Sequence, residues 1–255
     1  MTLSIAVICE DYPDRQTACC LADRVILDQF GDHRHDGWIA EEQLDAFRGY
    51  RGLEPGQEFI VWARIATLAQ EHPIKLIRGK FSGEFPMHGD EFNIRCAVQL
   101  LLFHASHPPD GIIFLRDTDN DVEKRKGLEA AREAVPRSTQ IPVVIGIADT
   151  KRECWHIAGF HPEDDQERQW LDELNQELGG DPCSRSEELT AKHDHDINSA
   201  KRVLKKLTGG DRELRCLIAL SLEDLKQRGK NNGLADFLTE LRQHLLPLFG
   251  AVPPN

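Results

Sequence analysis

The sequence predicts an α/β fold in which a parallel β-sheet is flanked by helices. Two observations predict it. Short apolar runs rich in β-branched residues alternate with helical patterns from the start of the chain to about residue 150. Several of these runs end in acidic residues, as strands do where a loop leads into the next helix. No convincing strand pattern follows residue 160, so the rest of the chain is expected to be helical.

Four runs are strand candidates, and they are residues 3–9, 74–77, 112–115 and 141–147. The first helix is expected over 14–30, because apolar residues recur at helical spacing and Gly31 is a typical stop. The same periodicity predicts further helices, and these are 41–50, 58–71, 90–104 and 121–134. The C-terminal helices are expected at 162–178, 196–207, 211–228 and 233–248.

These elements predict two parts of the chain. Residues 1–160 form the α/β domain, with residues of about 32–72 as a helical insertion. Residues 161–255 form a helical C-terminal extension, and the Gly-Gly-Asp-Pro stretch at 179–182 is the most plausible joint.

The composition limits location and partners. The chain has 255 residues, is 40% hydrophobic and contains no apolar run of membrane-spanning length, so we expect a soluble protein without a membrane partner. Its start lacks a basic leader and its seven cysteines show no CxxC spacing, which predicts a cytoplasmic protein.

The net charge of −12 argues against broad electrostatic binding to nucleic acid, but local basic clusters exist. One cluster lies near the acidic motif described below, and its members are Arg116, Lys124, Arg125 and Lys126. A second cluster, on the helix expected at 196–207, is more simply interpreted as a solvated helix face; its members are Lys201, Arg202, Lys205 and Lys206.

Three carboxylates, Asp117, Asp119 and Asp121, follow the apolar run at 112–115 at alternate positions. On an extended chain alternate side chains point the same way, so these acids are expected to converge on one cation. The alternative is an acidic turn or helix cap. Glu10 shifts the balance toward a metal site, because it ends the first strand and would share the carboxyl edge of the sheet if the two strands are neighbours.

This arrangement resembles the Toprim fold of topoisomerases, primases, and nucleases of the overcoming-lysogenization-defect and bacterial defence type. Glu10 matches the family Glu, and Asp117 and Asp119 match its Asp-x-Asp. Residues 153–159 resemble the stretch after the last strand in small Toprim-like bacterial proteins. The chain departs from the family in having Asp11 where Gly usually follows the Glu, and in the long segment before the Asp-x-Asp.

The resemblance implies that Asp117 and Asp119 hold Mg²⁺ or Mn²⁺, with Asp121 as an auxiliary ligand. It also implies that Glu10 binds a second metal or exchanges a proton with the attacking or leaving oxygen. A cation from the protein is expected to complete the site. Lys151 is the first candidate, and Lys80 and Arg78 come next.

The leading functional hypothesis is a metal-dependent nuclease of Toprim type that acts in anti-phage defence, with DNA favoured over RNA. The second is a non-catalytic Toprim-like module that binds an ATPase or another protein. A third is a glycosyltransferase that holds a sugar nucleotide through the Asp-x-Asp and Mn²⁺. The sequence leaves open whether the chain forms a homo-oligomer.

Overall fold

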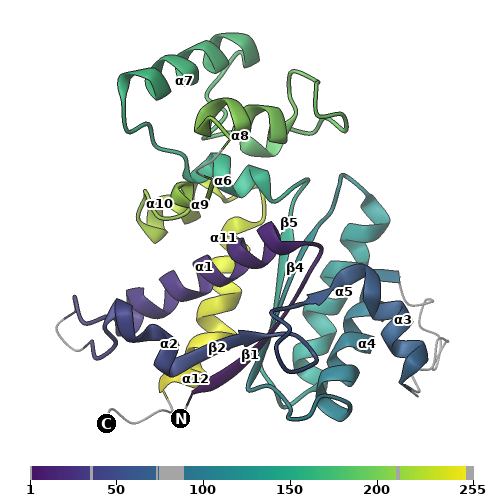
Figure 1. Ribbon diagram of the computed structural model, residues 1–255. Coiled ribbons are helices and arrows are strands. Elements are labelled where there is room, and N and C mark those ends of the chain that lie inside the picture. Colours follow the sequence, from purple (N-terminus) through teal and green to yellow (C-terminus); the bar gives the residue numbers. More distant parts are fainter. Residues whose placement is uncertain (1, 35–36, 73, 75–88, 211–212, 251–255) are drawn as a thin grey trace.

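The computed structural model describes residues 2–34, 37–72, 74, 89–210 and 213–250, and within them five strands form one parallel sheet (Figure 1). The strands are β1 (Leu3–Cys9), β2 (Arg48–Arg51), β3 (Ile60–Val61), β4 (Gly111–Asp117) and β5 (Val143–Ala148). Their order is β2-β1-β4-β5, and β3 pairs with the end of β1 beyond β2. The expected α/β fold with a parallel sheet is therefore confirmed.

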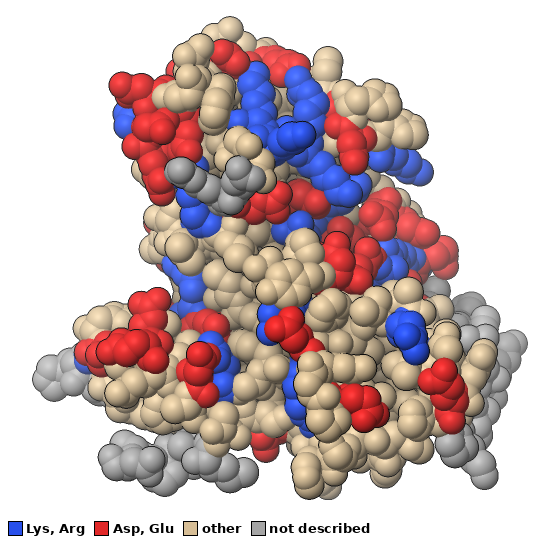
Figure 2. Space-filling view, viewed as in Figure 1, with Lys and Arg blue, Asp and Glu red and all other residues tan. Residues whose placement is uncertain are grey.

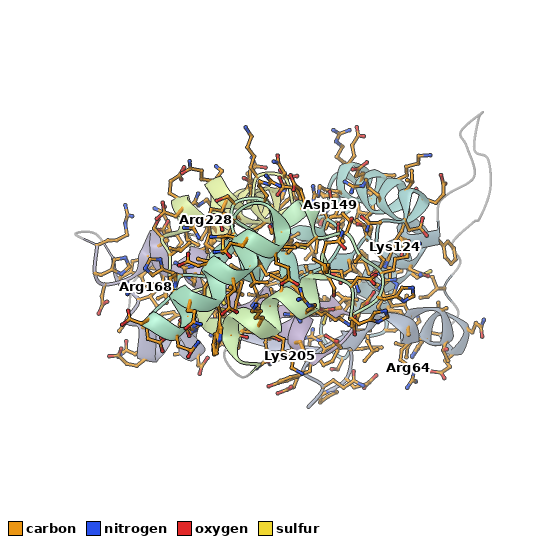
Figure 3. All side chains as sticks on the ribbon, turned by 90° about the horizontal axis from the view of Figure 1, so that it is seen from above. Arg64, Lys124, Asp149, Arg168, Lys205 and Arg228 are labelled. Carbon is orange, nitrogen blue, oxygen red and sulfur yellow. The ribbon has the colours of Figure 1, made fainter. Side chains whose placement is uncertain are left out.

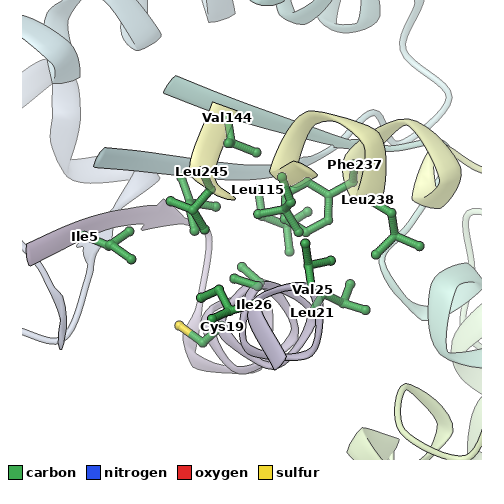
Figure 4. Packing of buried hydrophobic residues seen from close by; sticks show 14 of the residues in the cluster. Ile5, Cys19, Leu21, Val25, Ile26, Leu115, Val144, Phe237, Leu238 and Leu245 are labelled. Carbon is green, nitrogen blue, oxygen red and sulfur yellow. The ribbon is translucent and has the colours of Figure 1, made fainter. Parts of the chain in front are cut away.

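Helices cover both faces of the sheet, because successive side chains of each strand point to opposite sides. In β1, Ile5 and Val7 face a layer made of α1 (Tyr12–Phe30), α11 (Leu234–Glu240), η4 (Leu241–Leu245) and α12 (Leu246–Gly250). Ala6 and Ile8 face the other layer, made of α3 (Ile65–Glu71), α4 (Gly89–Phe103) and α5 (Val122–Ser138). Figure 4 shows the first layer, in which side chains of α1, the sheet and the C-terminal helices meet.

A small lobe stands beyond the carboxyl end of the sheet. It starts from α6 (Glu153–Gly159) and contains α7 (Asp165–Leu178), η3 (Ser186–Glu188) and α8 (Ala200–Thr208) (Figure 1). We call residues 160–210 the helical lobe. It has a core of its own, built by Leu174, Val203 and Leu207 against Ile157 of α6. The chain then returns through α9 (Glu213–Cys216) and α10 (Leu222–Arg228). None of the described helices is long and apolar enough to cross a bilayer.

The structure differs from the predicted elements in the segment before α4. The helix expected at 41–50 ends after η1 (Glu41–Gln43) and α2 (Leu44–Phe47), where β2 pairs with β1. The helix expected at 58–71 begins only after β3 and η2 (Trp62–Arg64). Both corrections have the same reason, which is that backbone groups on the edge of β1 pair with these residues. The strand expected at 74–77 lies, apart from Ile74, outside the described residues.

The C-terminal helices also differ in detail. The helix expected at 211–228 is divided into α9 and α10, and residues 211 and 212 are outside the described part. The helix expected at 233–248 is present, with π-helical geometry over Leu241–Leu245. Its first part packs on β5, so these residues complete the α/β core.

Gly233 is a position where the fold depends on glycine. Its φ is +88°, and a Cβ built there would lie 2.0 Å from the carbonyl oxygen of Ile147 in β5. We therefore expect Gly233→Ala to lower the free energy of unfolding by about 3 kcal/mol, because strain and a backbone clash add. Urea denaturation measures this change.

Gly179→Ala is the matched control. Gly179 ends α7 with a φ of +70°, but a Cβ there meets nothing within 4 Å. This variant is expected to cost about 1 kcal/mol, from the backbone conformation alone. Equal losses in the two variants would show that the contact with Ile147 does not matter.

Candidate functional site

The predicted acids lie at the carboxyl edge of the sheet. Glu10 directly follows β1, and Asp117 is the last residue of β4. The two strands are hydrogen-bonded neighbours, with Ile8 opposite Phe114. The prediction that Glu10 and the 117–121 cluster share one edge, if their strands are neighbours, is therefore confirmed.

The turn after β4 does not continue as an extended chain. Asp119 and Asn120 have φ values of 51° and 58°, in the left-handed region. Asp121 caps α5, since its carboxylate accepts hydrogen bonds from the backbone N–H groups of Glu123 (2.9 Å) and Lys124 (3.2 Å). The expectation that alternate spacing makes the three aspartates converge is therefore wrong beyond Asp117, and the helix-cap interpretation of Asp121 is confirmed.

The turns after β4 and β5 are joined by hydrogen bonds. The Thr118 Oγ1 accepts a hydrogen bond from the backbone N–H of Thr150 at 2.9 Å, and the N–H of Asp119 donates to the Thr150 carbonyl at 2.9 Å. Thr150 itself has a φ of 68°. Because Thr118 and Thr150 are buried, these bonds fix the positions from which the neighbouring acids project.

An outer pair of acids, Glu10 and Asp119, is bound by basic side chains from β4 and α5. Lys124 Nζ lies 2.7 Å from Asp119 Oδ2 and 3.7 Å from Glu10 Oε1. Arg116 forms an ion pair with Glu10, and its guanidinium lies 4.9 Å from the centre of the Trp62 ring. Two of the basic residues noted in the sequence thus belong to the site.

An inner trio of acids, Asp14, Asp117 and Glu153, surrounds Arg152. Arg152 Nε lies 3.0 Å from Asp14 Oδ1, and its Nη2 lies 3.6 Å from Glu153 Oε1. The backbone N–H of Arg152 donates to Asp117 Oδ1 at 2.9 Å. Asp14, Arg152 and Glu153 are each less than 10% exposed and Asp117 is half-buried, so the trio is largely shielded from solvent.

The inner trio is crowded with negative charge. Burial, followed by the charges of Asp14 and Glu153, raises the pKa of Asp117 to about 8. Burial and the charge of Asp11 raise the pKa of Asp14 to about 7, although Arg152 opposes the shift. At neutral pH Asp117 is therefore mostly protonated and Asp14 is about half ionised, beside the positive charge of Arg152.

Arg152 is itself held from the opposite side. Its Nη1 donates to His156 Nε2 at 2.8 Å and lies 3.6 Å from Glu213 Oε2. Burial, with a further effect of Arg152, lowers the pKa of His156 to about 3, so the imidazole is neutral. Its Nδ1 then donates to the Glu213 carbonyl at 2.9 Å, which leaves the lone pair of Nε2 to accept from Arg152.

The helical lobe touches the acidic turn. Asn120 Nδ2 donates to the Thr190 carbonyl at 2.9 Å, and Asn120 Oδ1 accepts from Thr150 Oγ1 at 3.1 Å. Hydrogen bonds from the N–H groups of Lys124 and Glu123 lower the pKa of Asp121, and the charge of Lys192 in the lobe acts in the same direction. Seen from above the lobe, Lys124 and Asp149 lie beside it, close to the carboxyl edge (Figure 3).

Part of this site was predictable from the sequence. Lys151, expected to supply the cation, is half-buried in the turn after β5, whereas its neighbour Arg152 contacts the inner trio. Lys80 and Arg78 lie outside the described residues. Among the residues that are described, no three His, Cys, Asp or Glu side chains stand close enough to ligate one metal ion.

Asp14 and Glu153 were not identified from the sequence, although a signal exists. Each lies in the first turn of the helix that follows a strand, α1 after β1 and α6 after β5. First turns that follow parallel strands meet at the same edge of a sheet, so acids at these positions are candidates to converge.

Comparison with known proteins gave no counterpart: no family model, no curated protein and no solved structure matches this chain.

Proposed function

We propose that the protein is a metal-dependent phosphodiesterase of Toprim-like fold that cleaves nucleic acid. The observation that carries this proposal is the gathering of five carboxylates at one sheet edge, from Glu10 and Asp14 after β1, Asp117 and Asp119 at the end of β4, and Glu153 after β5. A Glu after the first strand beside an Asp-x-Asp on its neighbour also supports the Toprim-like assignment.

The chemistry of the donor set fits a divalent cation, but the side chains would have to draw closer together to share one, since no three described His, Cys, Asp or Glu side chains stand close enough as they are. All five groups offer carboxylate oxygens, the ligands that Mg²⁺ and Mn²⁺ favour. Burial is the main cause of the raised pKa values of Asp14 and Asp117, and neighbouring carboxylates add to it, so a cation bound here would favour their ionised forms. On the inner side, the ion would be held by Asp14, Asp117 and Glu153. On the outer side, Glu10 and Asp119 would release Lys124 and Arg116 and bind the ion instead.

A cation bound there supplies Lewis-acid stabilisation of the developing phosphate charge and makes a water easier to deprotonate. The protein's own groups have separate roles in this proposal. Lys124 and Arg116, once released from Glu10 and Asp119, bind phosphate oxygens, and Trp62 holds the guanidinium of Arg116 in place. Glu10, whose side chain is partly exposed, takes up or returns the proton at the attacking or leaving oxygen.

Cleavage of labelled single-stranded DNA, single-stranded RNA and their duplexes tests the proposal directly. We expect cleavage with Mg²⁺ or Mn²⁺ and none in EDTA. The proposal fails if purified protein leaves all four substrates intact with either metal.

Metal binding and pH are expected to act together on thermal stability. Asp14 and Asp117 have folded pKa values of about 7 and about 8 against an ordinary 3.8, so the folded state binds more protons than the unfolded state between these values. Their contribution to the stability of the fold is complete below the ordinary pKa of 3.8 and is lost as pH rises through 7 and 8. Without metal, Tm should therefore fall by roughly 5 °C between about pH 5 and pH 8.

Saturating Mg²⁺ is expected to restore Tm mainly at about pH 8, because at low pH the ion must displace protons from the carboxyls. Differential scanning fluorimetry over this range measures both effects. Asp117→Asn should lose most of the Mg²⁺-dependent rise. The same rise at both pH values, or a full rise in Asp117→Asn, would contradict the proposed ligands.

One observation favours the second candidate, a non-catalytic module that binds an ATPase or another protein. Glu10 and Asp119 are bound by Arg116 and Lys124, a state in which their carboxylates need no metal. A protein with neither cleavage nor a Mg²⁺-dependent rise in Tm, which co-purifies with a partner protein, would support this function.

A further inference from the structure

The surface beside the acidic edge carries an exposed aromatic ring. Tyr12 begins α1 two residues after Glu10, and it is 47% exposed. Arg15 lies with its guanidinium 5.5 Å from the centre of the ring. Arg15 is in turn held by Glu58, at 3.8 Å from its carboxylate. The ring is therefore supported from the protein side while much of its surface is open to solvent.

A hollow of about 540 Å³ lies between the start of α1, where Pro13 follows Tyr12, and the end of the helical lobe. Pro13 and Gln16 of α1 line one side, and Gln16 is one helical turn after Tyr12. Gly210, two residues after α8, lines the other side, and Arg152 and His156 also line the hollow. The side chain of Lys205 lies over Gly210, since a Cβ built on that glycine would be 3.8 Å from Lys205 Cγ.

The basic residues of α8 are of two kinds. Arg202 and Lys206 are neutralised by Glu177 (2.5 Å) and Glu173 (3.0 Å) of α7. Lys201 and Lys205, one turn apart, are exposed, and no acidic partner contacts them within the part of the chain that the structure describes. Figure 2 shows basic side chains gathered on this part of the lobe, and Figure 3 places Lys205 at its edge.

We propose that the substrate of the site is a single-stranded nucleic acid, with a base stacked on Tyr12 and backbone phosphates bound by Lys201 and Lys205. The proposal rests on the phosphodiesterase function given above, and it names the substrate class of that site. Paired bases inside a duplex have no free face for stacking, whereas a single strand can place a base on Tyr12 and lead its backbone past the hollow to α8. The two free lysines supply the positive charge that such a backbone needs, in a chain with a net charge of −12.

Fluorescence anisotropy of labelled single-stranded DNA and RNA, with the whole 255-residue chain in EDTA, tests the contacts without cleavage. We expect single strands to bind more tightly than the matching duplex. Tyr12→Ala should weaken binding of the single strand by about tenfold, and Tyr12→Phe should retain most of the affinity, because the ring remains. Phe103→Ala is the matched control, since Phe103 is 70% exposed at the end of α4.

The double variant Lys201→Glu/Lys205→Glu tests the phosphate contacts. The slope of log K against log salt should become shallower by about 1.4, because each contact on a single strand contributes roughly 0.7. Lys226→Glu/Lys230→Glu is the matched control, with the same change of charge at α10 and just after it. Arg228, which ends α10, lies away from Lys205 (Figure 3).

Tighter binding of the duplex, or Tyr12 and lysine variants that bind as well as their controls, would overturn the proposal. Because binding and cleavage are measured separately, failure of the proposed contacts can be told apart from failure of the proposed chemistry. If no metal supports cleavage while these variants lose binding, the chemistry is wrong and the contacts stand. If cleavage occurs while binding is unaffected, the chemistry stands and the contacts are wrong.

Discussion

Asp117→Asn is expected to lower metal-dependent cleavage by about 10³-fold or more, because it removes the charge at the centre of the inner trio. The amide oxygen can still accept the hydrogen bond that Arg152 N–H donates to Asp117 Oδ1 at 2.9 Å, so the turn after β5 should keep its place. Glu10→Gln is expected to show a loss of similar size if Glu10 binds metal or moves a proton. Initial rates on a labelled oligonucleotide with Mn²⁺ measure both variants.

This variant has a second expected property that separates lost chemistry from lost folding. The raised pKa of Asp117 shows that its ionised form is unfavourable in the fold, so Asn should raise Tm at about pH 8 without metal. Glu133→Gln, at an exposed ion pair with Arg137 on α5, is the control that should change neither quantity. An active Asp117→Asn enzyme would remove Asp117 from the catalytic site.

The sheet was predictable where a strand is apolar on both faces. β1, β4 and β5 are buried between two helical layers, and their apolar runs reveal them in the sequence. β2 lacks such a run, since it reads Arg-Gly-Tyr-Arg. Its place is set by pairing with β1 and by Asp23 of α1, which accepts hydrogen bonds from Arg48 Nε and Tyr50 Oη, each at 2.7 Å. Partners so distant in sequence leave no local pattern.

The site was predictable where spacing and strand position agree. Glu10 and Asp117 end neighbouring strands, and an apolar run followed by an acid identifies both. Asp121 follows the same run, but left-handed residues redirect the chain before it and make it a helix cap. The position of Asp121 therefore depends on the conformation of the turn, which the contacts between Thr118 and Thr150 hold in place.

The sequence could not show which of Lys151 and Arg152 contacts the acids. The two cations are adjacent in sequence and both follow β5, so periodicity cannot tell which one faces the acids. The φ of 68° at Thr150 turns the chain, and the pocket formed by Asp14, Glu153 and His156 receives Arg152. Glu153 and His156 follow Arg152 closely in sequence, on α6, whereas Asp14 comes from α1 and only the folded structure brings it to them.

Arg152→Ala is expected to lower the free energy of unfolding by about 3–5 kcal/mol, because it leaves buried carboxylates without their cation. Asp14 and Glu153 are 6% and 8% exposed, so water cannot replace the guanidinium fully. The loss should be larger at about pH 8 than at about pH 5, since at low pH Asp14 and Asp117 can become neutral in the folded protein. Urea denaturation at the two pH values measures both expectations.

Lys151→Ala is the control for this prediction, because it removes a neighbouring positive charge that is only half-buried, and it should change stability by roughly 0.5 kcal/mol or less. Adding Asp14→Asn to Arg152→Ala should recover part of the loss, because one of the stranded charges is then absent. If Arg152→Ala costs no more than Lys151→Ala at either pH, the inner trio does not depend on Arg152. Recovery by Asp14→Asn would instead show that Arg152 acts mainly by balancing charge that a bound metal could balance equally well.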